Sequence, residues 1–393
     1  MEHEFVIVSA NRTAIGKMGG QLKDVQAGHL AATVIKDAIE RAGLAPEQIN
    51  EVIFGEVRQS TESSNLARVA ALRAGIPPEA SAYTVNRLCA SGIQAVISGV
   101  QHLAFNPDDI VVAGGAENMS RAPIYLRNSR FGEGNPYLVD SNLENGQQPI
   151  EMYGKDLGMG VTAENVAETY RISREDQDAF AMESQKRARL AIETGCFKSQ
   201  IVPIEIKTRK NTAVFQTDEH PRETSYEKLS QLKPVFKSDG TVTAGNACGR
   251  NDGASALVLM TREKANNLGV KSIAKIVNWS TAGVDPRYMG IGPVPAIENL
   301  LNKTGLTVED IVLFELNEAF ASQSLAVIRE AKLDPDKVNV NGGAIALGHP
   351  LGATGAIIMT KLIHEMQRRQ EKYGIATLCI GGGQGMAILL EMA

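Results

Sequence analysis

The stretch NVNGGAIALGHPLGATGA, residues 339–356, decides the fold because it belongs to a unit that occurs twice in the chain. It is rich in glycine, which costs backbone entropy and is tolerated where a backbone bends tightly or approaches a ligand. His349 is its single ionisable side chain. Beside Pro350, this histidine is a candidate catalytic base. From this stretch alone, a buried turn whose histidine only satisfies a carbonyl is an equally good interpretation.

The repeated unit consists of a strand, a reactive residue, a helix, a second strand and a run of glycines. In the C-terminal copy, a strand predicted at 338–341 leads to His349. In the N-terminal copy, a strand predicted at 82–86 leads to Cys89, and the strand at 110–113 that follows the helix ends in a glycine pair. This repeat predicts a duplicated α/β unit.

Other segments follow the same alternation of strands and helices. Residues 5–9 and 51–54 have the composition of buried strands, and 30–41 carries apolar residues at helical spacing. Residues 49–54 also resemble 308–314. Such alternation favours an α/β architecture with a mixed or parallel sheet.

A region of different composition separates the two halves. Residues 120–243 are richer in charge and polar turns, and contain an amphipathic helix predicted at 174–193. Between Lys198 and Arg250, nine Lys and Arg face six Asp and Glu. This positive bias could receive a phosphorylated ligand, but a solvated face is the better interpretation. The predicted domains are the N-terminal half (1–119 plus 244–270), the insert (120–243) and the C-terminal half (271–393).

The composition is that of an ordinary globular chain. Its 393 residues are 43% hydrophobic and 22% charged, with a formal net charge of −5, which allows two or three domains and an ample core. A mildly acidic chain does not predict binding to nucleic acid or anionic membranes, and we expect no run to span a bilayer. The start, MEHEFVIVSANRT, has the pattern of a first strand and not of a signal peptide, and the end carries no address motif. We therefore expect a cytoplasmic protein.

The four cysteines, Cys89, Cys196, Cys248 and Cys379, contain no CxxC pair. This spacing argues against a zinc ribbon or a thioredoxin-like motif, and we expect no metal site. Four cysteines in a chain of this length also argue against a disulfide framework.

Cys89 lies at the start of a predicted helix, in the sequence NRLCASG at 86–92. The positive end of the helix dipole and the free backbone N–H groups favour a thiolate, which is the nucleophilic form of cysteine. The alternative is a buried cysteine that packs as a small hydrophobic side chain.

Two further polar positions follow apolar strands. Cys379 ends a strand predicted at 375–380 and precedes GGGQG, whose backbone amides could supply an oxyanion hole worth about 3 kcal/mol per donor. Asn317 follows a strand predicted at 311–316, a position that points to a cleft in α/β folds, although a helix cap is the alternative. Cysteine, histidine and asparagine also occur together in cysteine hydrolases, but a hydrolase does not need the second cysteine.

Taken together, these motifs resemble the thiolase family over the whole chain. Joint occurrence by chance is negligible, because the motifs also stand in the family's order. They are NRLCASG (86–92), GGAENMSRAP (114–123), MGVTAENVA (159–167), DGTVTAGNACGRNDGA (239–254), NEAFA (317–321), NGGAIALGHPLGATGA (341–356) and CIGGGQG (379–385).

The resemblance implies a role for each reactive residue. Cys89 would be the nucleophile that holds the acyl group as a thioester, and His349 would activate Cys89 and polarise the thioester carbonyl. Cys379 would be the acid and base that moves the proton at the α-carbon, with a pKa near the working pH. Asn317 would hold a water that, with His349, stabilises the enolate oxygen. The backbone N–H groups of Cys89 and Gly381 would form the second oxyanion hole.

The resemblance also implies a fold and a reaction. Thiolases form or cleave a carbon–carbon bond between acyl units carried on coenzyme A, through an acyl-enzyme and therefore with ping-pong kinetics. Coenzyme A thioesters are substrates, and no metal or redox cofactor is needed. The family fold is a duplicated five-layer α/β/α/β/α sandwich, with an inserted loop domain that covers coenzyme A. Family members are homodimers or homotetramers.

The expected acyl pocket departs from the short-chain pattern at two places. A histidine that usually precedes the Met-Gly of this pocket is replaced by Gly158, and the usual serine near the pantetheine arm is replaced by Cys248, whose thiol is a weaker hydrogen-bonding group. Acetyl-CoA and acetoacetyl-CoA are the first expectation, because two methionines match that pattern, and a longer 3-ketoacyl chain is the second. The expected substrate-binding residues are Met159, Cys248, Met289, Ala244 and Phe320.

Two other classes are less compatible with these residues. A non-catalytic acyl-CoA or lipid-binding relative would not need the reactive set. A condensing enzyme that acts on carrier-protein substrates commonly uses two histidines with one cysteine, and this chain does not show that pattern.

Overall fold

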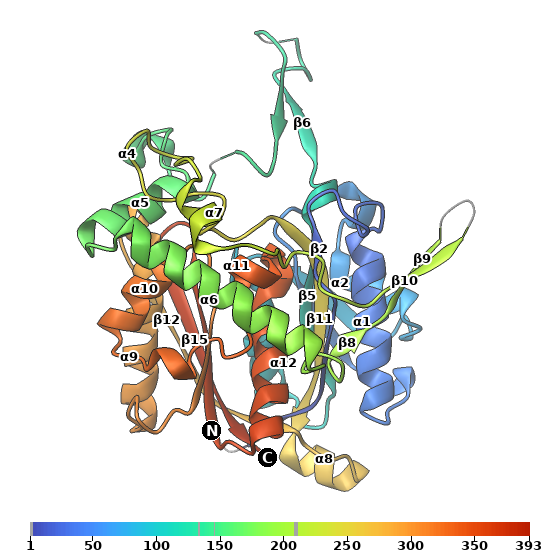
Figure 1. The fold of residues 1–393 in the computed structure, drawn as a ribbon. Coiled ribbons are helices and arrows are strands. Elements are labelled where there is room, and N and C mark those ends of the chain that lie inside the picture. The colour runs from blue at the N-terminus through green and yellow to red at the C-terminus, as the bar shows by residue number, and fades with distance from the viewer. Residues whose placement is uncertain (1–2, 133, 145, 208–210) are drawn as a thin grey trace.

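Two sets of strands with the same order make up the main sheet (Figure 1). The structure is a computed structural model and describes residues 3–132, 134–144, 146–207 and 211–393. The two sets join where β1 pairs with β12. From its edge inward, the N-terminal set is β4 (Ser81–Val85), β3 (Glu51–Gly55), β5 (Val111–Asn118), β11 (Asn251–Thr261) and β1 (Phe5–Thr13). The C-terminal set is β13 (Leu313–Leu316), β14 (Tyr373–Ile380), β15 (Gln384–Met392) and β12 (Ala274–Gly283).

The two sets share one hydrogen-bonding pattern. β3 lies parallel to β4 and β5, and β5, β11 and β1 follow as antiparallel neighbours. In the C-terminal set, β13 lies parallel to β14 and forms a parallel bridge from Phe314 to Val338, in the place that β4 holds in the first set. β14, β15 and β12 then follow as antiparallel neighbours. The predicted duplication is therefore confirmed.

The strand predicted at 338–341 is wrong beyond its first residue. After the bridge at Val338, Asn339 adopts a left-handed backbone with a φ of 47°. The Asn339 side chain accepts a hydrogen bond from Leu316 N at 2.9 Å and donates one to Leu316 O at 2.7 Å. This side chain therefore makes the hydrogen bonds to β13 that a strand backbone would have made, and the chain turns away into the loop of His349.

The strand predicted at 110–113 does not end at its glycine pair, which lies inside β5. A Cβ atom on Gly114 would lie 2.1 Å from the carbonyl oxygen of Ser255 on β11. A Cβ atom on Gly115 would lie 2.0 Å from the carbonyl oxygen of Gly352. These glycines let neighbouring backbones approach closely, and they do not terminate the strand.

Helices cover both faces of each strand set, which gives five layers in the order α/β/α/β/α (Figure 1). α3 (Ser91–Phe105) and α12 (Leu351–Arg369) pack against each other between the two sets. The expected five-layer sandwich is confirmed. The outer helices are α1 (Ala27–Arg41) and α2 (Leu66–Arg73) on the N-terminal set, and α9 (Pro293–Thr304) and α10 (Ala321–Glu330) on the C-terminal set.

Apolar side chains fill the spaces between these layers in three large clusters. The space under α1 and α2 holds the apolar stripe expected in 30–41, since Leu30, Val34 and Ile35 are buried there. The central space is filled by α3, α12 and the inner faces of both strand sets. The space under α9 and α10 is filled from the outer face of the C-terminal set. Burial of these side chains fixes the layers relative to one another.

Among the described residues, Leu88–Phe105 is long and apolar enough for a membrane-spanning helix. This finding corrects the expectation that no run of residues is long and apolar enough to span a bilayer. The segment contains α3, and 56% of it is buried inside the structure. α3 packs against β3, β5 and α12 in the central layer. A helix that is covered on several sides by other elements is apolar over most of its circumference, and this position accounts for its composition.

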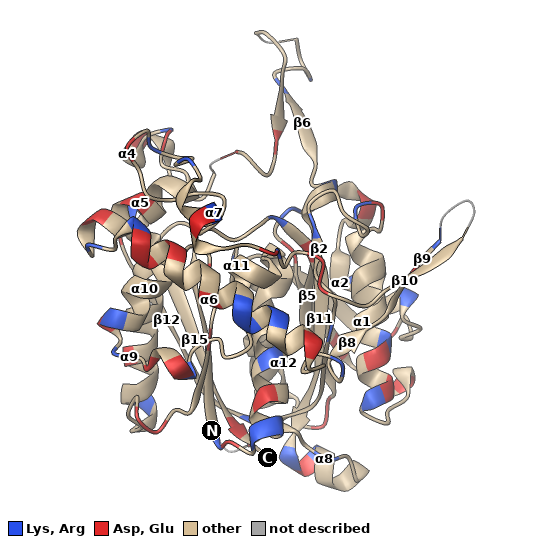
Figure 2. Ribbon diagram, viewed as in Figure 1, with Lys and Arg blue, Asp and Glu red and all other residues tan. Residues whose placement is uncertain are grey.

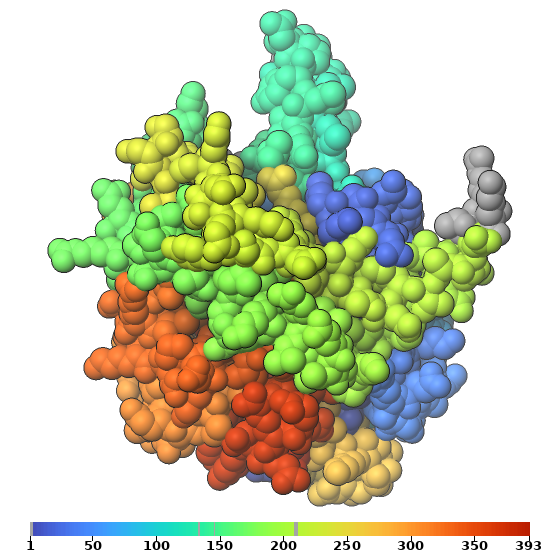
Figure 3. All heavy atoms as spheres, viewed as in Figure 1, coloured from blue at the N-terminus to red at the C-terminus, as the bar shows by residue number. Residues whose placement is uncertain are grey.

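The segment between β5 and β11 crosses one end of the layers (Figures 1 and 3). Its longest helix is α6 (Arg174–Glu193), as predicted, and the Ser173 side chain caps this helix by accepting from Asp176 N. Lys, Arg, Asp and Glu residues occur along α6, α1 and α8 and on the lower part of α12 (Figure 2). The other elements of this segment are β6 (Ile124–Arg127), β7 (Tyr137–Asp140), α4 (Ile150–Tyr153), α5 (Met159–Thr169), β8 (Ile201–Val202), β9 (Ile204–Lys207), β10 (Thr212–Phe215) and α7 (Tyr226–Ser230). Short elements elsewhere are β2 (Gly16–Lys17), α8 (Arg262–Leu268) and α11 (Ala344–Leu347).

Candidate active site

Cys89 and His349 occupy equivalent places in the two halves of the fold. Each lies two residues before the start of a central helix, Cys89 before α3 and His349 before α12. The two helices contact each other through their first turns, where Gly92 lies against Gly355. The duplication therefore brings together two reactive loops that lie far apart in the sequence.

A tight turn presents Cys89 at the end of β4. Leu88 adopts a left-handed backbone with a φ of 47°, and its N–H donates to Asn86 Oδ1 at 2.9 Å. Ser91 Oγ donates to Leu88 O at 2.7 Å and accepts from Arg87 N at 2.9 Å. These hydrogen bonds hold the connection from strand to helix and leave part of Cys89 exposed.

The Cys89 thiol is not a thiolate in this site. Burial raises the pKa of the thiol above its ordinary value, and the backbone N–H groups of Gly381 and Cys89 offset this only in part by hydrogen-bonding to the sulfur. The thiolate that the sequence predicts for a helix N-terminus is therefore wrong for the free site. Both N–H groups predicted for the oxyanion hole lie at this sulfur, and a base has to take the thiol proton before the sulfur can attack a carbonyl.

His349 is buried and fixed by three neighbouring side chains. Its backbone N–H donates to Asn251 Oδ1 at 3.0 Å. Its Nδ1 atom lies 2.6 Å from Thr354 Oγ1, and its Nε2 atom lies 3.5 Å from Asn317 Nδ2. Burial lowers the pKa of His349 to about 4, so the imidazole is neutral at ordinary pH. A neutral imidazole held in this way can accept a proton.

Asn317 ends β13 and faces His349. Its N–H donates to Thr377 O at 3.0 Å, which fixes it beside β14. The alternative role as a helix cap is wrong, because α10 begins at Ala321 and Phe320 is its N-cap. In the described part of the chain, Asn317 Oδ1 is buried without a hydrogen-bond partner. Such an atom is costly in a folded protein, and it fits the predicted role of holding a water.

Cys379 is the last but one residue of β14 and is buried. Burial raises the pKa of this thiol well above its ordinary value, and the nearby thiols of Cys89 and Cys248 raise it further. The expectation of a pKa near the working pH is therefore wrong for the free site, where Cys379 is a protonated acid. To act as a base, Cys379 first has to lose this proton to a reaction intermediate.

Cys248 lies close enough to Cys89 and Cys379 to interact electrostatically with both. Its backbone N–H donates to Ala319 O at 3.0 Å, in the loop that follows Asn317. Burial raises the pKa of the Cys248 thiol to about 12.

Within the described ranges, no group of three or more His, Cys, Asp and Glu side chains is arranged to hold a metal ion.

Three of the five predicted substrate-binding residues meet in one apolar cluster. Met159, Met289 and Phe320 pack together with Cys379. Cys248 lies beside the cluster, whereas Ala244 is exposed and outside it. The sequence did not indicate several neighbours of these residues, among them Phe236, whose ring meets the Phe320 ring edge-on with centroids 6.3 Å apart. Phe236 carries no motif, and only the fold of the insert brings it here. The other members of the cluster are Ala163, Val242, Ala247 and Ala319.

Two buried carboxylates that the sequence reading missed tie the reactive loops together. Glu318 accepts hydrogen bonds from Ser184 Oγ at 2.7 Å, Asn339 Nδ2 at 2.9 Å and Ile345 N at 3.1 Å, and so binds the Asn317 loop to the His349 loop. Glu117 accepts from the N–H groups of three residues, two in the loop after β3 and one in the first turn of α12. Both glutamates lie inside motifs that resemble the thiolase family, NEAFA and GGAENMSRAP. Their position inside these motifs could have indicated that they belong to the site. The donors to Glu117 are Val57 N (3.0 Å), Arg58 N (3.0 Å) and Gly352 N (2.8 Å).

Comparison with known families decides what kind of protein carries this site. Residues 5–263 match the family model described as thiolase, N-terminal domain, and residues 270–392 match that described as thiolase, C-terminal domain. The chain belongs to the thiolase family. Its members transfer acyl groups, and this thiolase is an acyltransferase enzyme.

Full-length relatives of this thiolase have similar names. The chain is 49% identical to an acetyl-CoA acetyltransferase of Syntrophomonas wolfei and 48% identical to the β-ketothiolase BktB of Cupriavidus necator, with 100% of both chains covered in each case. Its fold matches the crystal structure of the Bacillus anthracis acetyl-CoA acetyltransferase with a TM-score of 0.96, at 48% identity and 100% and 99% coverage. It matches that of human mitochondrial 3-ketoacyl-CoA thiolase in complex with CoA with a TM-score of 0.94, at 43% identity and 100% and 98% coverage.

Proposed function

We propose that this thiolase interconverts two acetyl-CoA molecules with acetoacetyl-CoA and coenzyme A by a ping-pong mechanism. The observation that carries the proposal is the convergence of Cys89, His349, Asn317 and Cys379 at the ends of equivalent elements in the two halves. The names of the full-length relatives agree with this substrate. Cleavage and condensation use the same groups, and metabolite levels set the direction.

The first half-reaction cleaves the 3-ketoacyl chain. Neutral His349 takes the proton of Cys89, and the Cys89 sulfur attacks the 3-keto carbon. The bond between C2 and C3 breaks, which leaves an acetyl group on Cys89 as a thioester and releases acetyl-CoA as its enolate. Asn317 and His349 stabilise the enolate oxygen, and Cys379 gives its proton to the α-carbon.

The second half-reaction returns the enzyme to its starting state. Cys379, now a thiolate, takes the proton of the coenzyme A thiol, and the coenzyme A sulfur attacks the carbonyl of the acetyl group on Cys89. The N–H groups of Cys89 and Gly381 stabilise the oxyanion, and Cys89 leaves as a thiol after His349 returns its proton. Coenzyme A thioesters are therefore substrates, and the scheme requires no metal or redox cofactor.

A 3-ketoacyl-CoA thiolase of broader or longer chain length is the second candidate. Gly158 removes the bulk of the usual histidine beside Met159, which leaves more room at one side of the apolar cluster. The likeness to human mitochondrial 3-ketoacyl-CoA thiolase also supports this candidate. Thiolysis of acetoacetyl-CoA and of 3-ketooctanoyl-CoA by the purified protein separates the two. We expect faster turnover of acetoacetyl-CoA; faster turnover of the longer chain overturns the chain-length proposal, and turnover of neither overturns the function.

A non-catalytic carrier of acyl-CoA is the alternative from another class. Incubation with acetyl-CoA followed by mass spectrometry of the intact protein distinguishes the two. An adduct of one acetyl group on Cys89 supports a catalyst, whereas reversible binding without an adduct supports a carrier.

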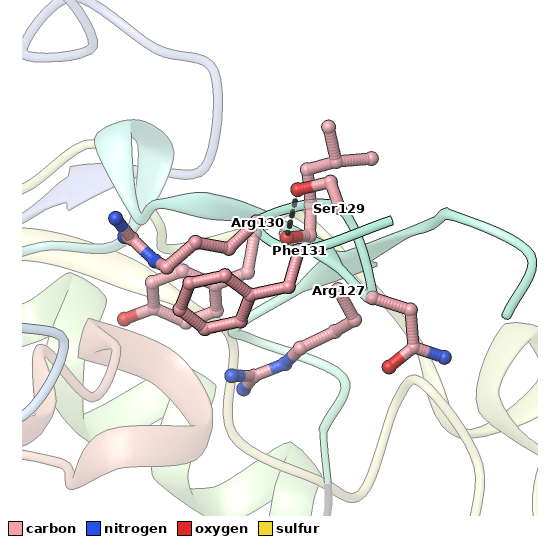
Figure 4. Close-up of a pocket in the computed structure, with 7 residues that line it drawn as sticks. Arg127, Ser129, Arg130 and Phe131 are labelled. Carbon is pink, nitrogen blue, oxygen red and sulfur yellow. Dashed lines mark hydrogen bonds between the residues drawn. The ribbon is translucent and has the colours of Figure 1, made fainter. Parts of the chain in front are cut away.

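We further propose that the protein is a cytoplasmic homodimer or homotetramer. Edge strand β4 exposes Tyr83, and an unpaired strand edge is a common place for association. The β6–β7 hairpin projects from the molecule and exposes Phe131, whose ring lies between the Arg127 and Arg130 side chains at a hollow in the hairpin loop (Figure 4). Light scattering tests the assembly. We also propose that the insert at 120–243 covers coenzyme A, between halves formed by 1–119 with 244–270 and by 271–393.

A further inference from the structure

Thr354, in the first turn of α12, is the one hydroxyl bonded to the imidazole of His349 in the described chain. Its side chain is 2% exposed, and its Oγ1 atom lies 2.6 Å from His349 Nδ1. The same Oγ1 atom lies 2.8 Å from the carbonyl oxygen of Pro350. A threonine hydroxyl has one proton, and a carbonyl oxygen can only accept. The Thr354 hydroxyl therefore donates its hydrogen bond to Pro350 O. Its Oγ1 atom accepts a hydrogen bond from the protonated Nδ1 of His349.

The contact at the other ring nitrogen agrees with this assignment. His349 Nε2 lies 3.5 Å from Asn317 Nδ2, and an amide nitrogen is a donor only. Nε2 must therefore present its lone pair to Asn317. A neutral imidazole carries one proton, and both contacts place this proton on Nδ1.

We propose that Thr354 is a positioning residue, which holds His349 in the Nδ1–H tautomer so that Nε2 carries the lone pair that takes the proton of Cys89. This proposal rests on the proposed function for the identity of that proton. The helix supports the role, because the bond to Pro350 O is a hydrogen bond from i to i−4 that fixes the hydroxyl rotor. The backbone of His349 is fixed separately by Asn251, so the hydroxyl acts on the orientation and tautomer of the ring alone.

Replacement of Thr354 by valine tests the role with little change of volume. Without the hydroxyl, the Nδ1–H group is buried without an acceptor, and the tautomer with the proton on Nε2 becomes competitive. We expect kcat for acetoacetyl-CoA thiolysis to fall by about 10- to 100-fold, which is part of the 10²- to 10⁴-fold that a well-placed general base supplies. KM should stay within about twofold, because the Thr354 side chain is 2% exposed and its hydroxyl contacts the imidazole and Pro350 O. Thr354→Ser keeps the hydroxyl and should retain most of the wild-type kcat.

Thr360 supplies a matched control on the same helix. It is also buried, and its hydroxyl bonds to Ser255 Oγ at 3.0 Å and to Asn11 O at 3.5 Å, away from His349. Thr360→Val therefore removes a buried threonine hydroxyl from α12 without removing a partner of the imidazole. An equal fall of kcat in Thr360→Val and Thr354→Val would overturn the proposal, because it would indicate general damage to the helix.

A spectroscopic measurement separates this proposal from the function on which it rests. ¹⁵N NMR of protein labelled at histidine distinguishes protonated from unprotonated ring nitrogens, and His349→Asn assigns the signal. We expect Nδ1 of His349 to be protonated in the wild type and in Thr354→Ser, and the proton to move at least partly to Nε2 in Thr354→Val. A wild-type ring protonated on Nε2 would overturn the role of Thr354. Failure of acetoacetyl-CoA thiolysis would overturn the proposed substrate and leave this readout intact.

Discussion

Gly92 and Gly355 place the backbones of α3 and α12 in direct contact. A Cβ atom on Gly92 would lie 2.5 Å from Ala356 N, and one on Gly355 would lie 2.4 Å from Ile93 N. Real Cβ atoms do not approach other atoms this closely, so neither position accepts a side chain without a shift of the helices. These two helices carry Cys89 and His349 at their starts, and the glycine pair therefore sets the spacing between the two reactive residues.

Gly92→Ala should damage stability and acyl transfer together. The added methyl group meets backbone on the facing helix and not a flexible side chain, so the helices must separate, at a cost of about 1–3 kcal/mol or more in unfolding free energy. Urea unfolding followed by circular dichroism measures the first effect, and single-turnover acetylation of Cys89 measures the second. Gly283→Ala is the control, since a Cβ atom there meets nothing within 4 Å. A Gly92→Ala variant with wild-type stability and acetylation would show that the contact does not set this spacing.

Cys89→Ala should abolish acyl transfer and leave the fold intact. Removing the sulfur removes the atom that holds the acyl group, while the buried neighbours of Cys89 lose only a small side chain. Intact-protein mass spectrometry after incubation with acetyl-CoA should show no adduct, and thiolysis should fall to background. Cys196→Ala is the matched control, because Cys196 is also a free, partly buried thiol but lies at the end of α6, 3.3 Å from Thr194 Oγ1. Normal turnover by Cys89→Ala would exclude Cys89 as the nucleophile.

Acetylation of Cys89 should stay constant as the pH falls from 7.5 to about 5.5. Burial lowers the pKa of His349 to about 4, so the imidazole remains neutral over this range. A histidine with an ordinary pKa of about 6.5 would lose roughly 90% of its neutral form at pH 5.5. Stopped-flow single turnovers give the profile, and an acid limb centred near pH 6.5 would contradict the prediction.

The lowered pKa of His349 also makes the stability of the fold depend on pH. Between pH 6.5 and about 4, the unfolded chain binds a proton at His349 that the folded chain does not bind. Stability therefore rises with pH across this window, and the part due to His349 is lost as the pH falls through it. Burial lowers the pKa of His220 to about 4 as well, so that residue contributes with the same sign. His220→Gln should reduce the slope of unfolding free energy against pH in this window.

The sequence predicted those features that depend on local pattern or on order along the chain. The duplication, the bounds of α6 and the places of Cys89 and His349 all follow from strands, helices and turns that are contiguous in sequence. The prediction of a strand at 338–341 was wrong because the Asn339 side chain, and not the backbone, makes the hydrogen bonds to Leu316. A hydrophobic pattern does not reveal which of the two makes these bonds.

The electrostatics of the site could not be predicted in the same way. A helix start predicts a lowered pKa for Cys89, but burial reverses the direction, and burial also raises the pKa of Cys379 above the working pH that was expected for it. The role of Thr354 depends on which atom accepts the hydrogen bond from its hydroxyl group. The positions of Pro350 O and His349 Nδ1 around this hydroxyl decide that, and the sequence does not give them. Ala244 is exposed and lies outside the apolar cluster, so its expected contact with substrate stays a prediction.

Glu56→Gln should stabilise the protein at alkaline pH and not at acid pH. Burial and, as the smaller cause, the neighbouring carboxylate of Glu117 together raise the pKa of Glu56 to about 8. The Oε2 atom of Glu56 is buried without a partner in the described chain. The folded pKa lies above the unfolded value of 4.5, so the stability due to the protonated carboxyl is complete below pH 4.5 and is lost as the pH rises through 8. A glutamine cannot ionise and avoids this loss, which is on the order of a few kcal/mol. The midpoint of urea unfolding should therefore rise in Glu56→Gln relative to the wild type at pH 9 and not at pH 5. The exposed Glu40, changed to glutamine, is the control, and equal midpoint shifts of Glu56→Gln at both pH values would show that Glu56 is already ionised in the folded protein.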